Sequence, residues 1–541
     1  MNRILYPIIS LLFFPLCLSA QNFNESVEVT NELQVDLSGS ERKTIEMEIP
    51  DSLSQFRLDF DYEVFSRPYK GAYEFTPYNV LFRPLAQKEK NPFFYLRAGA
   101  GFAFNPELLA VVSPRLGDKF RLNVYQDFSA FSGDYRGKAD FIYRGYEAKE
   151  LLGVQGNAYL KKSELDFDLF YRGIWASDFN CAYFPFHTFG AKLGLSSTPA
   201  SQSSVEYELD LSFRSSVEKE QASDLTENLL DFSGLIRPVI DFPVQAEVLF
   251  NTGFDFYGIS SNHSTYYLKL NPRLTYRLKQ LYLRGGFVFS LYTGEMRYQP
   301  IAFYPDVRLS LRLFKNSMDL FAGIDGGDNL NSLYSLKVAN PHFNRLYIQD
   351  DWSRMLKTSA VKANYFIGLK GSIASLFQYE LRAGYAKHKA GLLYGMDSVL
   401  ESQAVLRYAD YNLAYLEAEA SFKRKSYEIN AALKYRKMYY DIPTPDFFEL
   451  PGFSANLDFT YNWIERIYAG ASLRLQSGRE SQIYDTLPPY FDLGLHLSAE
   501  LNSSLSLWLR GKNLLFSRVE DVPFTAQRWP EISLGLCLIF R

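Results

Sequence analysis

The chain has 541 residues, a formal net charge of −4 and a mean hydropathy of −0.17. The small net charge argues against a partner that is recognised through a strongly basic surface, such as nucleic acid. It contains 39 Tyr, 45 Phe and 5 Trp. Aromatic rings with a polar tip suit the membrane–water interface, where transmembrane barrels carry aromatic girdles. After the N-terminus no run reaches the roughly 18 apolar residues of a spanning helix.

The N-terminus predicts a signal peptide over residues 1–20. The apolar run from Ile4 to Leu18 follows a basic residue and is short for a bilayer, which disfavours the alternative of an anchor helix. We expect cleavage after Ala20. Lipid attachment at Cys17 is not expected, because Leu16 stands where lipoprotein processing needs a small residue.

Residues 21–92 form a polar segment that prolines interrupt repeatedly. We expect it to be irregular or weakly β, and to lie on the periplasmic side or within the lumen of the domain that follows. That domain, residues 93–541, repeats a single pattern to its end: about ten residues of alternating character and then a turn.

The run from Phe453 to Trp463 shows the pattern most clearly. Its odd-numbered residues are all apolar or aromatic and its even-numbered residues are all polar. Because side chains alternate across a strand, such a run has one oily face and one wet face. Runs of about ten residues are long enough for a tilted strand to cross a bilayer, whereas soluble strands average about five or six.

The order of the connections separates a barrel from a soluble sandwich. Tight turns follow the even-numbered runs and long loops follow most odd-numbered ones, as in outer-membrane barrels. The even count places both ends of the barrel on the periplasmic side. The fold class is therefore predicted as all-β, a transmembrane antiparallel barrel of about 22 strands. The runs are expected to start near residues 94, 107, 119, 149, 164, 186, 203, 225, 243, 265, 280, 303, 317, 360, 376, 412, 426, 453, 466, 490, 504 and 532.

The last run ends in the pattern that the barrel-assembly machinery reads: a polar residue, a glycine and alternating apolar positions closed by an aromatic. The residues that fit are Ser533, Gly535, Leu538 and Phe540. Arg541 departs from the pattern, because it makes the aromatic residue penultimate.

The segment before the last strand resembles the closing hairpin of TonB-dependent receptors. It has Asn513-Leu514 at the end of a strand, a loop with Pro523, and Arg528 leading into the final strand. This resemblance implies a 22-stranded barrel in the cell outer membrane and passage of a solute or nutrient. The 72 residues of segment 21–92 are too few for that family's plug domain. The chain therefore resembles a receptor barrel that lacks a full plug, and energy coupling through a plug is not carried over to it.

The alternation assigns charged side chains to the lumen, where they either solvate the wall or form a surface that selects solutes. The candidates are Glu206, Glu208, Asp210, Arg214, Glu417, Glu419, Lys434, Arg436, Arg474, Asp492, Glu500 and Arg510. The long connection at residues 327–359, like segment 21–92, is a candidate to fill part of the lumen. The oxygen-rich stretch from Asp325 to Asn329 lacks the spacing of a calcium loop, and we interpret it as a turn.

Two functions remain open at this stage. The first is passage of solutes or nutrients, and the alternative is a structural or assembly role in an envelope complex without transport. An enzyme is not expected, because no G-x-S-x-G motif and no grouping of Ser, His and an acid is present. No cofactor or metal is expected either. The expected partners are outer-membrane lipid, the barrel-assembly machinery and periplasmic or envelope proteins, with no nucleic acid.

Overall fold

The computed structural model describes residues 92–540, except for 118, 137–141, 178–182, 199–203, 220–223, 241–242, 259–261, 295–298, 315–317, 343–357, 375, 397–403, 443–445, 465, 482–485, 522, 524–525 and 528. Its elements are β1 (Phe94–Phe102), β2 (Glu107–Val112), β3 (Phe120–Arg136), β4 (Ile142–Tyr159), β5 (Ser163–Ser177), β6 (Tyr183–Ser197), β7 (Val205–Glu218), β8 (Leu225–Pro238), β9 (Val244–Gly258), β10 (Asn262–Leu278), β11 (Leu281–Thr293), β12 (Ile301–Phe314), β13 (Met318–Leu330), α2 (Leu333–Ala339), β14 (Thr358–Ile373), β15 (Phe377–Met396), β16 (Ala404–Arg424), β17 (Tyr427–Tyr439), β18 (Phe453–Trp463), β19 (Ile467–Gln476), β20 (Tyr490–Asn502), β21 (Leu505–Lys512), β22 (Ala526–Gln527) and β23 (Glu531–Phe540).

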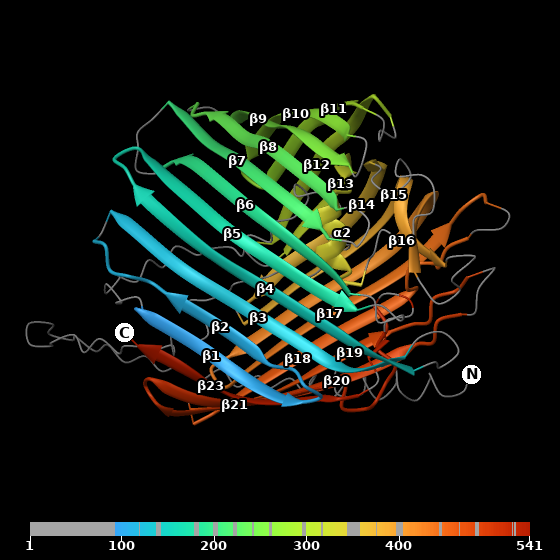
Figure 1. Ribbon diagram of the computed structural model, residues 1–541. Coiled ribbons are helices and arrows are strands. Elements are labelled where there is room, and N and C mark those ends of the chain that lie inside the picture. The colour runs from blue at the N-terminus through green and yellow to red at the C-terminus, as the bar shows by residue number, and fades with distance from the viewer. Residues whose placement is uncertain are drawn as a thin grey trace, which may run out of the picture. The chain divides into compact units, whose positions relative to one another are not determined.

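The strands form one closed antiparallel ring. Each strand from β1 to β20 pairs with the next, β21 pairs with β23, and β23 pairs back to β1, where Phe94 lies opposite Phe540. The two-residue strand β22 pairs only with the end of β3 and is not part of the ring. The wall therefore consists of 22 of the 23 described strands. Figure 1 shows these strands as a tilted barrel with α2 inside the ring. The prediction of an antiparallel barrel of about 22 strands is confirmed.

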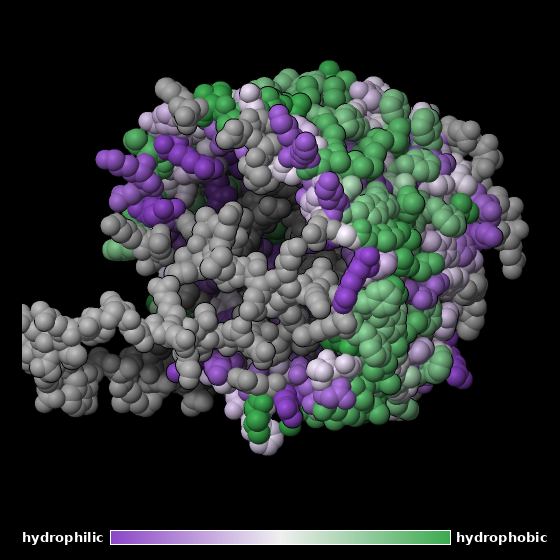
Figure 2. Space-filling model, turned by 90° about the vertical axis from the view of Figure 1, so that its left-hand side faces the viewer, coloured by the Kyte–Doolittle hydropathy of each residue, from purple (hydrophilic) through white to green (hydrophobic). Residues whose placement is uncertain are grey.

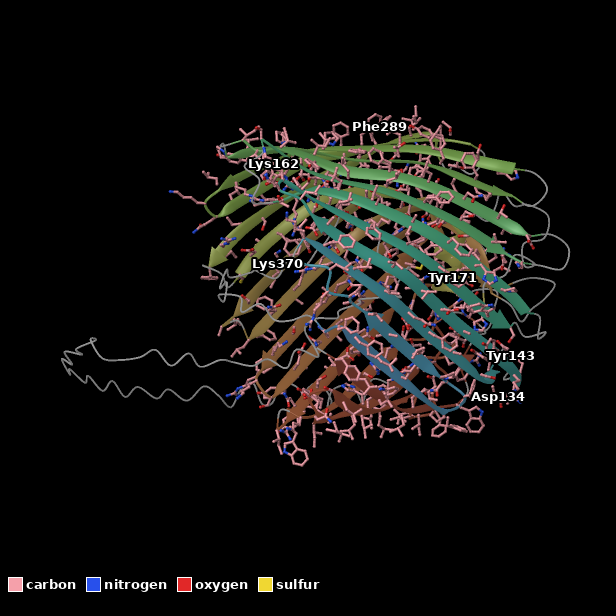
Figure 3. The ribbon with its side chains drawn as sticks, turned by 60° about the vertical axis from the view of Figure 1, so that its left-hand side comes forward. Asp134, Tyr143, Lys162, Tyr171, Phe289 and Lys370 are labelled. Carbon is pink, nitrogen blue, oxygen red and sulfur yellow. The ribbon has the colours of Figure 1, made fainter. Side chains whose placement is uncertain are left out.

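The connections differ between the two rims. Short turns such as the one between Tyr159 and Ser163 lie at one rim, and the long loops lie at the other. Figure 3 shows Lys162 at the first rim and Asp134 and Tyr143 at the opposite rim. The barrel wall begins and ends at the rim with the short turns, which matches the parity that the sequence predicts.

The two faces of the wall differ in chemistry. The outer face carries exposed apolar side chains, for example Phe189 at 63% exposure and Leu534 at 62%. Figure 2 shows hydrophobic residues along the flank of the wall and hydrophilic residues around the opening. We call the face opposite these exposed apolar side chains the inner face. A closed ring leaves no sheet edge to be solvated, so an apolar exterior of this kind suits a wall in contact with lipid.

The expected strand starts agree with the structure to within three residues, except at two strands. Strand β4 begins at Ile142 instead of 149, and β16 begins at Ala404 instead of 412. The interpretation of Asp325 to Asn329 as a turn is wrong: β13 continues through this stretch to Leu330, with a bulge between Asp325 and Gly327.

Other expectations concern residues outside the described part of the chain. These are the signal peptide over 1–20 and the segment over 21–92 apart from Pro92. Among the described helices, none has the length and apolar character needed to cross a bilayer.

Two glycines lie at the seam of the barrel, which is the pairing of β1 with β23 that closes the ring. Gly99 of β1 and Gly535 of β23 lie directly opposite each other, and the indole of Trp508 from β21 lies over both. A Cβ atom on Gly535 would overlap the carbonyl oxygen of Ala98 and the Trp508 ring. Glycine is therefore needed at these two positions because the Trp508 ring and the neighbouring backbone approach too closely for a Cβ atom, and not because the backbone dihedral angles require it.

Candidate functional site

The inner face carries a chain of alternating charges across six neighbouring strands, β7 to β12, which we call the charge ladder. Its members, in order of contact, are Glu206, Arg237, Glu247, Arg273, Asp306 and Arg284. The successive N–O distances are 3.1, 2.7, 3.7, 2.6 and 2.9 Å. Each strand contributes one side chain, because every second residue of a strand faces inward.

Burial increases along the ladder from Glu206 to Asp306, and Arg284 after it is 16% exposed. The side chain of Glu206 is 49% exposed, whereas those of Arg273 and Asp306 are 8% and 5% exposed. Asp306 accepts hydrogen bonds from Arg273 Nε at 2.6 Å and from Asn271 Nδ2 at 3.2 Å, and forms an ion pair with Arg284. A buried carboxylate is tolerated only when it is paired in this way. The ladder therefore has a solvated end at Glu206 and a buried, structural part around Arg273 and Asp306.

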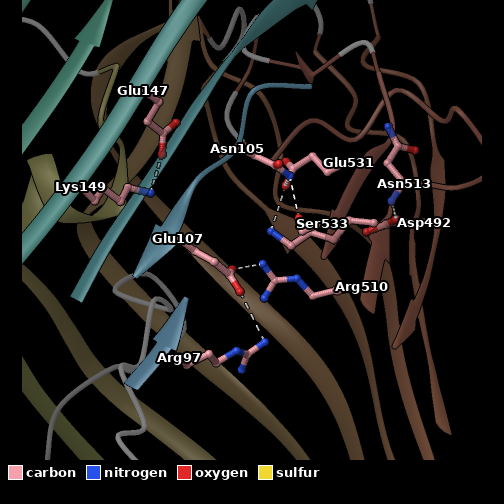
Figure 4. A network of polar contacts seen from close by, with 11 residues as sticks. Arg97, Asn105, Glu107, Glu147, Lys149, Asp492, Arg510, Asn513, Glu531 and Ser533 are labelled. Atoms are coloured by element: carbon pink, nitrogen blue, oxygen red, sulfur yellow. Dashed lines mark hydrogen bonds and ion pairs between the residues drawn. The ribbon is translucent and has the colours of Figure 1, made fainter. Parts of the chain in front are cut away.

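A second charged group lies near the barrel seam. Glu107 of β2 forms ion pairs with Arg510 of β21 and, at 3.5 Å, with Arg97 of β1 (Figure 4). Both guanidinium groups lie over the ring of Trp508, at 4.6 and 5.6 Å from its centroid. These contacts join β1, β2 and β21 on the inner face, where cation–π pairs and charge pairs add to the backbone ladder.

The helix α2 lies in the connection between β13 and β14 and packs on the inner face. Leu333 and Leu336 are buried in one cluster with Ile174, Phe186 and Leu225. Lys337 Nζ forms an ion pair with Glu218 Oε1 at 2.6 Å, and both side chains are 1% exposed. The expectation that connection 327–359 fills part of the lumen therefore has a structural counterpart in its described residues.

A second loop packs inward beside β14 to β17. Phe447 is buried in a cluster with Leu393, Tyr411 and Met438. This loop is also tied to its neighbours by backbone hydrogen bonds, such as that from the Phe448 N–H to the Tyr394 carbonyl at 2.7 Å.

The structure distributes the twelve candidate residues over β7, β16, β17, β19, β20 and β21. It does not gather them into one site. Some have partners on the inner face: Glu206 with Arg237, Asp210 with Lys192, Arg214 with the Tyr334 ring, Arg474 with Asp521, Asp492 with the Asn513 N–H, and Arg510 with Glu107. Glu417 lies across from Lys434 in the β16–β17 register. Glu208 and Glu419 are exposed, and Lys434, Arg436 and Glu500 are partly buried.

Most of the ladder was not among the sequence candidates. Arg237, Glu247, Arg273, Arg284 and Asp306 lie in strands where the same alternation holds, for instance between Leu270 and Leu274. A systematic reading of the charged residues between outward-facing apolar ones would have found them. Lys337 gave no such signal, because it lies in the short helix α2 and not in a strand.

No protein-family model and no curated protein sequence matches this chain. Solved structures do match its fold. The FrpB iron transporter from Neisseria meningitidis has a TM-score of 0.65 at 9% identity, covering 84% of this chain and 83% of that one. The siderophore receptor PirA from Acinetobacter baumannii has a TM-score of 0.63 at 10% identity, covering 83% and 80%. The copper transporter OprC has a TM-score of 0.61 at 12% identity, covering 83% and 80%. At these identities the likeness shows a shared barrel fold.

Proposed function

We propose that this chain is an outer-membrane barrel that passes a solute or nutrient across the membrane of a Gram-negative envelope. The observation that carries the proposal is the charged inner face, which includes side chains such as Glu208 and Glu419 that are exposed and have solvent around them. Charged groups in a barrel interior need water, and a wet interior is a path for polar solutes. The similar structures include an iron transporter, a siderophore receptor and a copper transporter, which agrees with this class of function.

Several parts of the proposal rest on the sequence. We infer that residues 1–20 direct export, that 21–92 lie at the periplasmic side or in the lumen without forming a full plug, and that Ser533, Gly535, Leu538 and Phe540 are read by the assembly machinery. Periplasmic partners and the lumen-lining role of the twelve candidates belong to the same inference. None of these inferred roles involves catalysis.

Reversing exposed inner-face charges is expected to change ion selectivity. Glu208→Lys and Glu419→Lys each replace a negative charge by a positive one. A unit charge about 8 Å from a passing ion in water changes the energy of that ion by about 0.5 kcal/mol, and salt at about 0.1 M reduces this to about half. A reversal changes the side-chain charge by two units and acts with opposite signs on K⁺ and Cl⁻, so the ratio of K⁺ to Cl⁻ permeability should fall by about fivefold per substitution. The measurement is the reversal potential of the full mature chain in planar bilayers under a KCl gradient.

Neutral variants provide the matched control. Glu208→Gln and Glu419→Gln keep the side-chain size and should give about half of the shift in reversal potential. If wild-type protein and all variants insert but carry no current, the structural or assembly role becomes the better reading. If they carry current with identical reversal potentials, the charged face does not line the path.

A further inference from the structure

We propose that the segment of residues 332–342, which contains α2, sets the size limit for solutes at the loop end of the barrel. We call it the α2 segment. The inference deepens the proposed function and rests on it. It assigns to one described element of the chain the role of deciding which polar solutes are small enough to pass.

The α2 segment is fixed to one side of the wall by charged contacts. The backbone N–H groups of Leu333 and Tyr334 donate to the two carboxylate oxygens of Glu227 on β8, at 2.6 and 3.1 Å. Lys337 and Glu218 of β7 form their ion pair one turn further on. Both acids lie near the loop end of their strands. A carboxylate that accepts from the first N–H groups of a helix also has a favourable interaction with the helix dipole.

The end of the α2 segment is fixed to a different part of the same wall. His342 Nε2 lies 3.2 Å from Glu147 Oε2 of β4, and its Nδ1 lies 3.2 Å from the carbonyl oxygen of Ser177 at the end of β5. The His342 ring also packs edge-on against Tyr135 of β3 at 5.2 Å. The segment therefore follows the inner face from β8 to β3, at the rim that carries the long loops.

The segment also contacts the opposite part of the ring. The apolar cluster that contains Leu333 and Leu336 is packed against Leu392 of β15 and Leu406 of β16. Five strands, β10 to β14, separate these two from β9, which contributes Tyr257 to the same cluster. The α2 segment therefore lies between side chains of strands that are far apart in the ring, with the extended hairpin of β15 and β16 on one side of it. Figure 1 shows α2 between the front and back strands.

A segment held at both walls narrows the path at this level, and its width depends on the segment remaining docked. Lys337 is the sensitive point, because its removal leaves Glu218 buried without a counter-charge. Such a loss shifts the docking equilibrium by more than about a hundredfold. Replacing both partners by apolar residues of similar volume removes that penalty.

The test measures passage of sugars of increasing size into proteoliposomes that contain the full mature chain. Arabinose, raffinose and stachyose are the probes, and the readout is each swelling rate relative to that of arabinose. Lys337→Met is expected to raise the relative rate for stachyose by about tenfold, because undocking widens the path. The double variant Lys337→Met/Glu218→Leu should return to the wild-type size limit, which a misfolded barrel would not do.

Two further variants make the result decisive. Replacement of residues 333–339 by a Gly/Ser linker of equal length removes every anchoring side chain of α2 and should abolish the size limit; an unchanged limit would overturn the inference. Arg407→Gln breaks an exposed ion pair with Asp446 in another loop and should leave the limit unchanged. If it widens the path as much as Lys337→Met does, the α2 segment is not the determinant.

The outcomes also separate this inference from the proposed function. Wild-type passage of arabinose with no change in any α2 variant contradicts the inference alone. No passage of any sugar through the wild type or the linker variant contradicts the proposed function. If sugars pass through the linker variant but not through the wild type, both the proposed function and the inference are supported, and the docked α2 segment closes the path.

Discussion

Asp306→Ala is expected to lower the free energy of unfolding of the barrel by about 3–5 kcal/mol, because it removes one partner of a buried charge network. Asp306 pairs with Arg273 and Arg284 and accepts from Asn271. Without it, two guanidinium groups that are 8% and 16% exposed lose the carboxylate that they share, while Arg273 keeps Glu247 at 3.7 Å and Arg284 keeps its attraction to Asp325. Neither arginine can lose its proton in response.

The measurement is unfolding by guanidinium chloride in lipid vesicles, followed by tryptophan fluorescence. Glu206→Ala is the matched control, since it removes the acid at the exposed end of the same ladder. Its side chain is 49% exposed, and a solvated pair of this kind is worth about 0–1 kcal/mol. If the two variants lose the same free energy of unfolding, burial does not determine how much each charge of the ladder contributes to stability.

The sequence predicted the wall well because two-faced strands carry their own signal. Nearly every strand start was predicted to within a few residues, and the two large errors have one cause. In β4 and β16 the strand extends past the lipid, and the outward positions there hold exposed charged residues such as Arg144 and Asp410. Once the outer face meets water, apolar alternation is no longer required and the pattern that marks a strand disappears.

Contacts between the barrel wall and the segments packed inside it could not be predicted from the sequence. Alternation places Glu218 on the inner face, but nothing local indicates that its partner is Lys337, 119 positions away in α2. The helix α2 has only seven residues, which is too short for a periodic pattern to predict. The same limit explains why twelve candidates were proposed as a set and yet lie on six strands with separate partners. The alternation in a strand predicts which face of the wall a residue lies on, but it does not predict which residues from other parts of the chain contact it in the lumen.

Gly535→Val is expected to lower the folding equilibrium constant of the barrel by about fivefold to 150-fold, because overpacking a close contact costs about 1–3 kcal/mol. The added side chain meets the Ala98 carbonyl oxygen and the Trp508 ring. The carbonyl belongs to the β1–β23 ladder and cannot withdraw without opening the seam. The measurement is refolding of the purified, urea-unfolded chain into lipid vesicles, with the folded fraction read from heat-modifiable migration on gels.

Gly285→Val is the control, because a Cβ at Gly285 of β11 has no atom within 4 Å and meets open space. Refolding without the assembly machinery separates two roles of Gly535 that coincide in a cell. If the steric role dominates, Gly535→Val fails in vesicles while Gly285→Val folds like the wild type. If Gly535→Val refolds normally in vesicles but is poorly assembled in cells, the glycine matters as part of the signal formed with Ser533, Leu538 and Phe540. The seam then tolerates the side chain by moving Trp508, and the close approach of β1 and β23 is not what selects glycine there.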